Sequence, residues 1–232
     1  MSRAATTAIR LRDLSVAYHG HPAVHHVSGE FAPGSLTAVV GPNGAGKTSL
    51  LAAIMGRLPL AAGAVERPAV GTIAWLPQQS EIDRSFPIRV GDLVAMGHWR
   101  RTGSFGAVSA GQRDAVLQAL HAVGLAGFVR RPIGELSAGQ FQRVLFARVL
   151  LQDAPVILLD EPFNAIDART TADLLALVRR WHAESRTVIA VLHDLDQVRA
   201  HFDDTLLLAR RCVAWGPTAQ VLQAGNLFRA RQ

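Results

Sequence analysis

The feature that most constrains this chain is the octapeptide GPNGAGKT at residues 41–48. It follows a short β-rich run, residues 35–40, and precedes a helical pattern, residues 48–55. Glycines in such a turn permit backbone geometry that is closed to residues with a Cβ, so successive N–H groups and the start of a helix can wrap an anion. In this strand–loop–helix context the pattern predicts a phosphate-binding loop. The structural alternative is a glycine-rich turn with a chance lysine.

Two residues of this loop have predicted contacts. Lys47 is expected to reach the β- and γ-phosphates of a nucleotide, and the Thr48 hydroxyl to ligate Mg²⁺. Lys47 is the only lysine in a chain with 23 arginines. A compact ammonium fits a tight phosphate cradle where a planar guanidinium does not, which accounts for lysine at this one position.

Composition predicts a folded protein. Hydrophobic residues make up 49% of the 232 residues and charged residues 18%, which is enough for a core and too little charge for disorder. No apolar run approaches the ~20 residues of a membrane-spanning helix, and the first residues lack a secretory h-region. The single cysteine, Cys212, allows no internal disulfide. We therefore expect a soluble, cytoplasmic chain.

The net charge of +6 does not by itself indicate nucleic acid. The basic residues occur as scattered doublets, and no run of five or more exists. Solvated faces explain dispersed doublets more simply than a nucleic-acid surface does, and a mild attraction to an anionic membrane also fits.

A second chemical signal is VILLDEP at residues 156–162. An apolar run that ends in two carboxylates is expected where a buried strand emerges at the ligand edge of an α/β sheet. Because adjacent strand residues point in opposite directions, Asp160 and Glu161 should have different roles. We expect Asp160 to hold Mg²⁺ through water and Glu161 to act as general base on the attacking water. Alone, such a strand end is common; the upstream phosphate loop gives it weight.

The order of elements predicts an α/β core with a helical insertion. Lys47 and Asp160 lie 113 positions apart, which is too long for one βαβ step. We place a helical subdomain at about residues 82–152, within one domain that spans residues 1–232. The remaining expectations are an antiparallel opening sheet at residues 9–18 and 24–31, a strand at 72–76, helices at 90–96, 112–123, 138–152 and 169–184, buried parallel strands at 156–160 and 187–192, and two short strands and a helix within 205–221.

The segment LSAGQ, residues 136–140, opens one of these helices. Ser137 is a predicted N-cap, so the capped helix start could face a phosphate. By itself an ordinary capped helix explains the pattern. We call residues 136–140 the signature segment.

Three further residues complete the candidate set. His193 follows the strand at 187–192 and should lie at the same sheet edge as the phosphate loop. Gln78 follows the strand at 72–76 and could reach Mg²⁺ or the attacking water. Tyr18, the only tyrosine, could stack on adenine, although an aromatic in a strand more often packs in a core.

Taken in order, these segments resemble the ATP-binding subunits of ABC transporters, over nearly the whole chain. The phosphate loop occurs in many families, whereas LSAGQ shortly before VILLDEP is specific. The resemblance implies an ABC ATPase fold: α/β, with a RecA-like P-loop core, an N-terminal antiparallel β subdomain and an inserted α-helical subdomain. The segments that carry it are Tyr18, GPNGAGKT, Leu76–Gln78, LSAGQ, VILLDEP, Asn164–Asp167 and His193.

The resemblance also implies that two copies pair head to tail and hold two ATP molecules between them. Ser137 and Gly139 are then expected at the γ-phosphate of the partner's ATP, and Asp167 on a loop that links the two sites. Catalysis is assigned to Glu161, His193 and Gln78, and the Mg²⁺ of MgATP to Thr48, Gln78 and Asp160. The implied nucleotide-contacting set is Tyr18, Gly41, Pro42, Asn43, Gly44, Ala45, Gly46, Lys47, Thr48, Ser49, Ser137, Gly139, Gln140, Asp160 and Asp167.

The implied partners are integral membrane permease subunits and, through them, a periplasmic or extracellular substrate-binding protein. The chain is then expected at the cytoplasmic face of the inner membrane, without a nucleic-acid partner. One position departs from the family, which usually has LSGGQ: Ala138 replaces the first of the paired glycines. Alanine costs little at a helix start, so we expect activity to survive.

The cargo is a softer expectation. Residues 80–97 and 167–182 are similar to the corresponding segments in ATPases of zinc and manganese importers, and zinc is the expected cargo, with manganese next. The alternatives are a ferric siderophore or cobalamin importer, a soluble ABC protein acting on nucleic acid or ribosomes, and a small-molecule kinase with the same loop. A zinc sensor is a further possibility, from the cluster His19, His21, His25 and His26, but no cysteine or carboxylate pattern completes it.

Overall fold

The computed structural model describes residues 8–18, 21–69, 72–98 and 109–231. The chain forms two compact units. The first unit contains residues up to Ile73, Pro155–Glu161 and Arg179 onward; the second contains Ala74–Ala154 and Pro162–Val178. The sequence predicted a helical subdomain at about 82–152, within the bounds of the second unit. No helix among the described residues is both long and apolar enough to cross a membrane.

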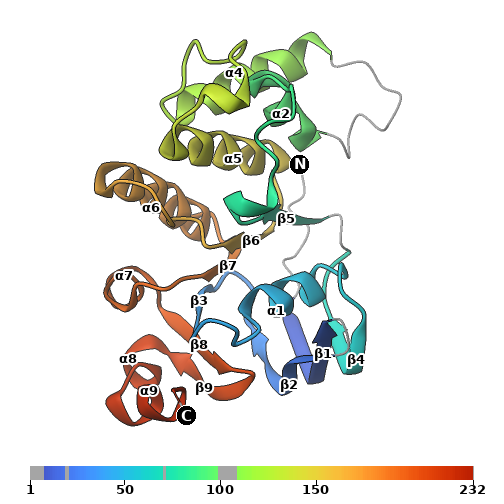
Figure 1. Ribbon diagram of the computed structural model, residues 1–232, viewed down its shortest axis with the longest axis vertical. Helices are drawn as coiled ribbons and strands as arrows, with labels where there is room; N and C mark the ends of the chain where they lie inside the picture. Colours follow the sequence, from blue (N-terminus) through green and yellow to red (C-terminus); the bar gives the residue numbers. More distant parts are fainter. Residues whose placement is uncertain (1–7, 19–20, 70–71, 99–108, 232) are drawn as a thin grey trace. The chain divides into compact units, whose positions relative to one another are not determined.

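An antiparallel sheet opens the first unit (blue to cyan in Figure 1). Its order is β2-β1-β4, with β1 at Ile9–Tyr18, β2 at His21–Phe31 and β4 at Leu60–Glu66. Alternate apolar side chains of β1, such as Ile9 and Leu11, are buried, as expected for a half-buried strand. Strand β4 was not predicted, because its sequence LAAGAVE lacks alternation and most of it is exposed.

The first unit also holds the strands in the order β6-β7-β3-β8-β9. Strands β6, β7, β3 and β8 run parallel to their neighbours, and β9 pairs antiparallel with β8. Every residue of β3, β6 and β7 is buried, which explains their continuous apolar runs, since parallel strands are covered on both faces. Their bounds are Leu36–Val40 for β3, Val156–Asp160 for β6, Thr187–Val191 for β7, Asp204–Ala209 for β8 and Arg211–Pro217 for β9.

The helices of the first unit are short. Helix α1, Lys47–Ile54, follows the phosphate loop and packs against the opening sheet. Helices α7 (Leu195–His201) and α9 (Ala224–Arg229) were not predicted, whereas α8 (Thr218–Val221) was. Cys212 lies half-buried in β9, and burial raises the pKa of its thiol, which disfavours the reactive thiolate.

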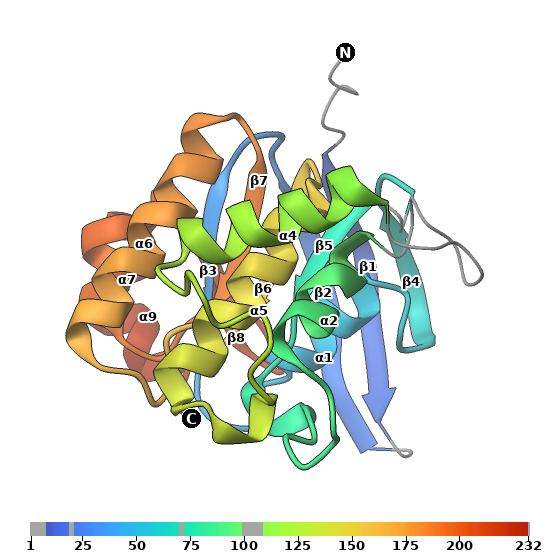
Figure 2. The ribbon, with the colours of Figure 1, turned by 90° about the horizontal axis from the view of Figure 1, so that it is seen from above.

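The second unit is mainly helical (Figure 2). Helices α2, Val90–Ala95, and α4, Ala110–Ala122, pack against α5, Ala138–Gln152. The bounds of α5 equal those that the sequence predicted. Strand β5 (Ile73–Leu76) leads into this unit, three 3₁₀ turns lie at Gln79–Glu81, Met96–His98 and Ile133–Glu135, and helix α6 (Ala168–Ala183) begins in it.

Candidate functional site

The phosphate loop connects β3 to α1 in the first unit. Gly46 is the N-cap of α1 and has φ +90°, in the left-handed region. A Cβ at Gly46 would collide with the carbonyl oxygen of Ala23, so both the conformation and the space require glycine. Gly44 also has a positive φ, +76°, but a Cβ placed there would meet nothing within 4 Å. The loop therefore places backbone N–H groups at a helix start that no side chain caps.

The side chain of Lys47 is bonded to the backbone of this loop. Its Nζ donates hydrogen bonds to the carbonyl oxygens of Gly41 and Pro42, both at 2.9 Å, and the residue is only 6% exposed. Burial lowers the pKa of Lys47, while the carboxylates of Glu161 and Asp160 raise it. The ammonium therefore lies within electrostatic reach of Asp160, the last residue of β6, and of Glu161, which follows it.

The two carboxylates differ in their backbone. Asp160 is the last residue of β6 and is 0% exposed. Glu161 lies beyond the strand and has φ +48°, so it occupies a left-handed turn. The predicted reason for their different roles, alternation along a strand, is therefore wrong for Glu161: a backbone turn, not the strand pleat, directs its side chain.

His193 lies next to Glu161, at the sheet edge where the sequence predicted it. Its Nε2 is 2.6 Å from Oε1 of Glu161, and the Glu161 side chain is 17% exposed. An N–H at Nε2 would donate to the carboxylate and fix its orientation. The loops after β6 and β7 thus bring together a carboxylate and an imidazole that are 32 positions apart in the chain.

These groups suit a magnesium nucleotide. The loop offers uncapped helix N–H groups and one ammonium for phosphate oxygens. Thr48 and Asp160 offer the hydroxyl and carboxylate oxygens that Mg²⁺ prefers. The N–H groups, ammonium, hydroxyl and carboxylate of the first unit therefore fit the magnesium nucleotide that the loop motif implies.

The signature segment lies in the second unit, and its predicted cap is confirmed. Ser137 is the N-cap of α5, and its Oγ accepts a hydrogen bond from Gln140 N at 3.2 Å. The Gln140 side chain accepts in return from Ser137 N at 3.1 Å. This reciprocal capping box satisfies two backbone donors. Ser137 itself is exposed.

Gln142, a buried polar residue of α5, was assigned no role from the sequence. Gln142 is 1% exposed, and its Nε2 donates to the carbonyl oxygen of Pro162 at 2.6 Å. Its Oε1 accepts from Gln79 Nε2 at 2.7 Å. Gln142 therefore anchors both the segment that follows Glu161 and the segment that follows Gln78. A glutamine among apolar helix positions was the available signal, since a buried amide needs partners.

Gln78 and Asp167 also lie in the second unit. Gln78 is half-buried and precedes the turn Gln79–Glu81. Asp167 precedes α6 and accepts from both the backbone N–H and the hydroxyl of Thr170, each at 2.8 Å. These two hydrogen bonds lower the pKa of Asp167, and the bond from the backbone N–H has the larger effect. Its predicted role in linking two sites remains a prediction.

The remaining sequence candidates lie partly outside the description. Tyr18 ends β1, but its side chain and His19 fall outside the described residues. His26 Nδ1 pairs with Asp13 Oδ1 at 2.8 Å. Among the residues that the structure describes, no group of three or more His, Cys, Asp or Glu side chains is arranged to hold a metal ion.

Comparison with known proteins identifies close relatives. The family model described as ABC transporter matches residues 24–164. The manganese transport system ATP-binding protein MntB of Listeria monocytogenes is 40% identical over 218 residues, which cover 91% of each chain. The zinc transport system ATP-binding protein TroB of Treponema pallidum is 39% identical over 229 residues, covering 96% of this chain and 86% of TroB.

Solved structures agree on the fold. A metal-chelate type ABC transporter in an inward-facing conformation matches with a TM-score of 0.87 and 28% identity, over 97% of this chain and 88% of that chain. The ADP conformation of MJ1267, an ATP-binding cassette of an ABC transporter, matches with a TM-score of 0.79 and 21% identity, over 97% of this chain and 99% of that chain. The predicted α/β fold with its P-loop core is thereby confirmed. This chain belongs to the ATP-hydrolysing ABC transporter family.

Proposed function

We propose that this chain is the ATP-binding and ATP-hydrolysing subunit of an importer for a transition metal ion, zinc or manganese. The observation that carries the hydrolytic part is the cluster of Lys47, Glu161 and His193 at one edge of the parallel sheet. The metal rests on relatives named for manganese and zinc transport, at 40% and 39% identity. These relatives favour a metal ion over the siderophore and cobalamin alternative.

Different residues of the first unit bind ATP and hydrolyse it in this proposal. The backbone N–H groups at the start of α1, which no side chain caps, and the Lys47 ammonium bind the β- and γ-phosphates. Glu161 accepts a proton from the attacking water, and His193 orients the Glu161 carboxylate through their 2.6 Å contact. Tyr18 stacks on adenine. Lys47 leaves its two carbonyl partners when phosphate oxygens replace them.

The magnesium ion of MgATP would be held by Thr48 and Asp160, with Gln78 as a further ligand. When bound, Mg²⁺ neutralises charge on the phosphate oxygens. Asp160 is fully buried at a strand end, so its position is fixed by the sheet.

Hydrolysis requires a second copy in this proposal. Two chains pair head to tail, and Ser137 and Gly139 of the partner subunit contact the γ-phosphate held by Lys47. The exposed position of Ser137 at the start of α5 supports this arrangement, because a helix start favours negative charge. Asp167 lies between the two nucleotides in the pair.

The pair works on integral membrane permease subunits at the cytoplasmic face of the cell membrane. The second unit contacts the permease near Gln78 and passes on the movement that nucleotide causes. A substrate-binding protein outside the membrane delivers the metal ion to the permease. The relatives' names as ATP-binding proteins of transport systems support this division of labour.

The variant Glu161→Gln tests the hydrolytic assignment. It should bind MgATP but lose about 100-fold or more of the ATPase rate, because the general base is gone. With MgATP it should elute from a sizing column as a dimer, and without nucleotide as a monomer. The control Glu66→Gln removes a surface carboxylate of the same unit and should keep full activity. A Glu161→Gln chain that stays monomeric with MgATP would refute the paired arrangement.

The identity of the transported ion is tested separately, by a transport assay. The permease that co-purifies with this chain is reconstituted with it in vesicles that hold the chain and MgATP on their inner side, and uptake of zinc and manganese from the outside is measured. Competition between the two ions decides the cargo. Uptake of neither ion, together with uptake of a ferric chelate, would move the assignment to the siderophore alternative.

A further inference from the structure

We propose that Arg143 is a positioning residue that holds Asp167 against the signature segment and ties both to the end of α4. The inference rests on the proposed pairing of two copies, in which Asp167 and the signature segment meet the second chain. Arg143 was not among the residues to which the sequence assigned a role. All the groups that it contacts belong to the second unit.

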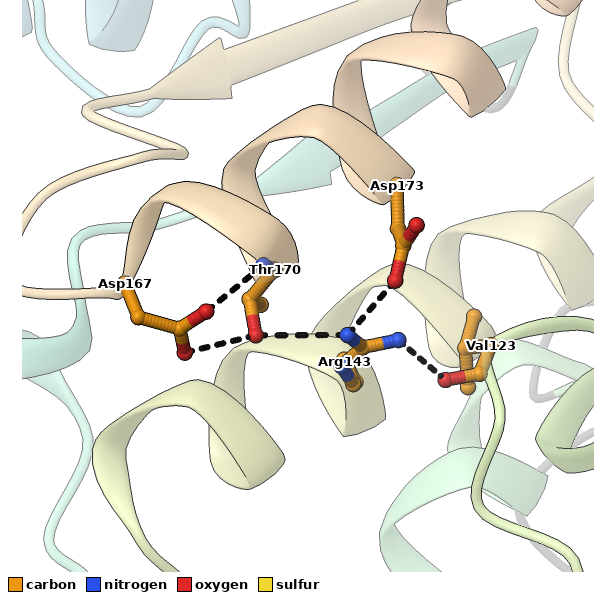
Figure 3. A network of polar contacts seen from close by, with 5 residues as sticks. All are labelled: Val123, Arg143, Asp167, Thr170 and Asp173. Atoms are coloured by element: carbon orange, nitrogen blue, oxygen red, sulfur yellow. Dashed lines mark hydrogen bonds and ion pairs between the residues drawn. The ribbon is translucent and has the colours of Figure 1, made fainter.

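The guanidinium of Arg143 joins three segments (Figure 3). Its Nη2 donates to Oγ1 of Thr170 at 3.2 Å and to Oδ2 of Asp173 at 2.8 Å, both on α6. Its Nη1 donates to the carbonyl oxygen of Val123, directly after α4, at 3.0 Å. A planar fork with fixed donors can serve all these acceptors at once, which a lysine ammonium on a flexible stem cannot do in the same geometry.

Thr170 passes this contact on to Asp167. The Thr170 hydroxyl has one proton, and it donates that proton to Oδ2 of Asp167 at 2.8 Å. Its oxygen is thereby left to accept from Arg143, so the direction of each bond in the chain from guanidinium to hydroxyl to carboxylate is determined. The backbone N–H of Thr170 donates to the other oxygen of Asp167, also at 2.8 Å.

The signature segment lies against the same pair. A Cβ built on Gly139 would be 3.5 Å from Oγ1 of Thr170 and 3.6 Å from Oδ2 of Asp167. Gly139 and Arg143 are four positions apart on α5, so they share one face of the helix. One face of α5 thus presents the signature backbone and the side chain that holds Asp167.

Burial separates this contact from an ordinary surface ion pair. The Arg143 side chain is 17% exposed and Thr170 6%, whereas Asp173 is 53% exposed. The ion pair with Asp173 alone would contribute little, because water screens it. The shielded bonds to Thr170 and Val123 fix geometry instead: a displacement of the end of α4 reaches Asp167 through three hydrogen bonds.

The test uses Arg143→Lys and Thr170→Val, singly and together, in the Glu161→Gln chain. Each single variant should raise the MgATP concentration needed for pairing by about tenfold, through loss of a charge-assisted or relayed bond. Binding of nucleotide to the monomer, measured with a fluorescent ATP analogue, should not change, because that site lies in the first unit. The double variant should be no worse than either single one, since both changes break one chain of bonds.

Hydrogen exchange in the unpaired chain gives a second, independent readout. The backbone amides of Thr170 and Thr171 should exchange faster in Arg143→Lys, because Asp167 accepts from Thr170 and its carbonyl from Thr171. Arg179→Lys, the same substitution at an exposed position of α6, is the control and should change neither readout.

The inference would be overturned by unchanged pairing in Arg143→Lys, by unchanged exchange at Thr170 and Thr171, or by additive effects in the double variant. Weaker nucleotide binding by the monomer would also overturn it, because the effect would then be a general loss of fold. If the Glu161→Gln parent itself fails to pair, the proposed function fails, and the exchange measurement still decides the role of Arg143.

Discussion

The starts of α1 and α5 are both expected to face phosphate, yet they are built differently. Gly46 is the N-cap of α1, in a left-handed conformation, and offers no side chain to cap the first turn. Ser137 caps α5 with a capping box, in which Gln140 also takes part, so two donors are already satisfied. The start of α1 thus has no side-chain cap, whereas the start of α5 has two backbone N–H groups bonded by its own side chains.

The largest effect is expected at Lys47, whose ammonium lies in the phosphate loop. Lys47→Ala should weaken MgATP binding by about 100-fold, because the loop loses the single cation that the phosphates meet. Equilibrium binding of a fluorescent ATP analogue measures this. The loss should not be regained at high magnesium concentration. Tight binding by Lys47→Ala would remove the assignment of this loop to phosphate.

The next effect separates space from conformation in the same loop. Gly46→Ala and Gly44→Ala both place a side chain at positive φ, which costs about 1–2 kcal/mol each. Only Gly46→Ala also drives a Cβ into a backbone carbonyl, so it should unfold at lower urea and bind ATP more weakly than Gly44→Ala. Urea midpoints of the two variants provide the measurement. Equal midpoints would show that the loop adapts more freely than its geometry implies.

A smaller effect is expected at the start of α5, which has a capping box. Ser137→Ala removes a capping box and should cost about 1 kcal/mol of unfolding free energy. Ser109→Ala removes the same device from α4, where Gln112 completes it, and should cost a similar amount. Only Ser137→Ala should also weaken MgATP-driven pairing in the Glu161→Gln chain. Equal effects of both variants on pairing would reduce Ser137 to an ordinary cap.

The smallest effect is expected at the departure from the family pattern. Ala138→Gly restores the usual signature and should change stability by less than about 1 kcal/mol. Its ATPase rate should equal or slightly exceed that of the parent chain, measured by phosphate release. A large loss of rate would mean that the signature segment has been assigned wrongly.

The comparison also explains how much the sequence could predict. The phosphate loop depends on glycines at fixed spacing, and the strands β3, β6 and β7 on short apolar runs, so both were predictable from local pattern. The cap at Ser137 was predictable for the same reason. Strand β4 was not, because LAAGAVE is mostly exposed and has weak β character.

The surroundings of the signature segment depend on distant partners. Gln142 meets Pro162, 20 positions away, and Arg143 meets Asp173, 30 positions away. On the sequence such residues resemble any polar position of a helix, and only the packing of α5 against its neighbours gives them partners. The turn at Glu161 was missed similarly, since a positive φ at glutamate has no local signal.

Lys47 also determines what amine chemistry this protein can undergo. It is the only lysine, so an acylating reagent finds one side-chain amine in the whole chain, and that amine lies in the phosphate loop. Burial lowers its pKa, and the same burial, with the hydrogen bonds to Gly41 and Pro42, restricts the access of a reagent. Beyond the terminal α-amine, amine labelling therefore reports on a single position, which lies in the loop that we propose binds phosphate.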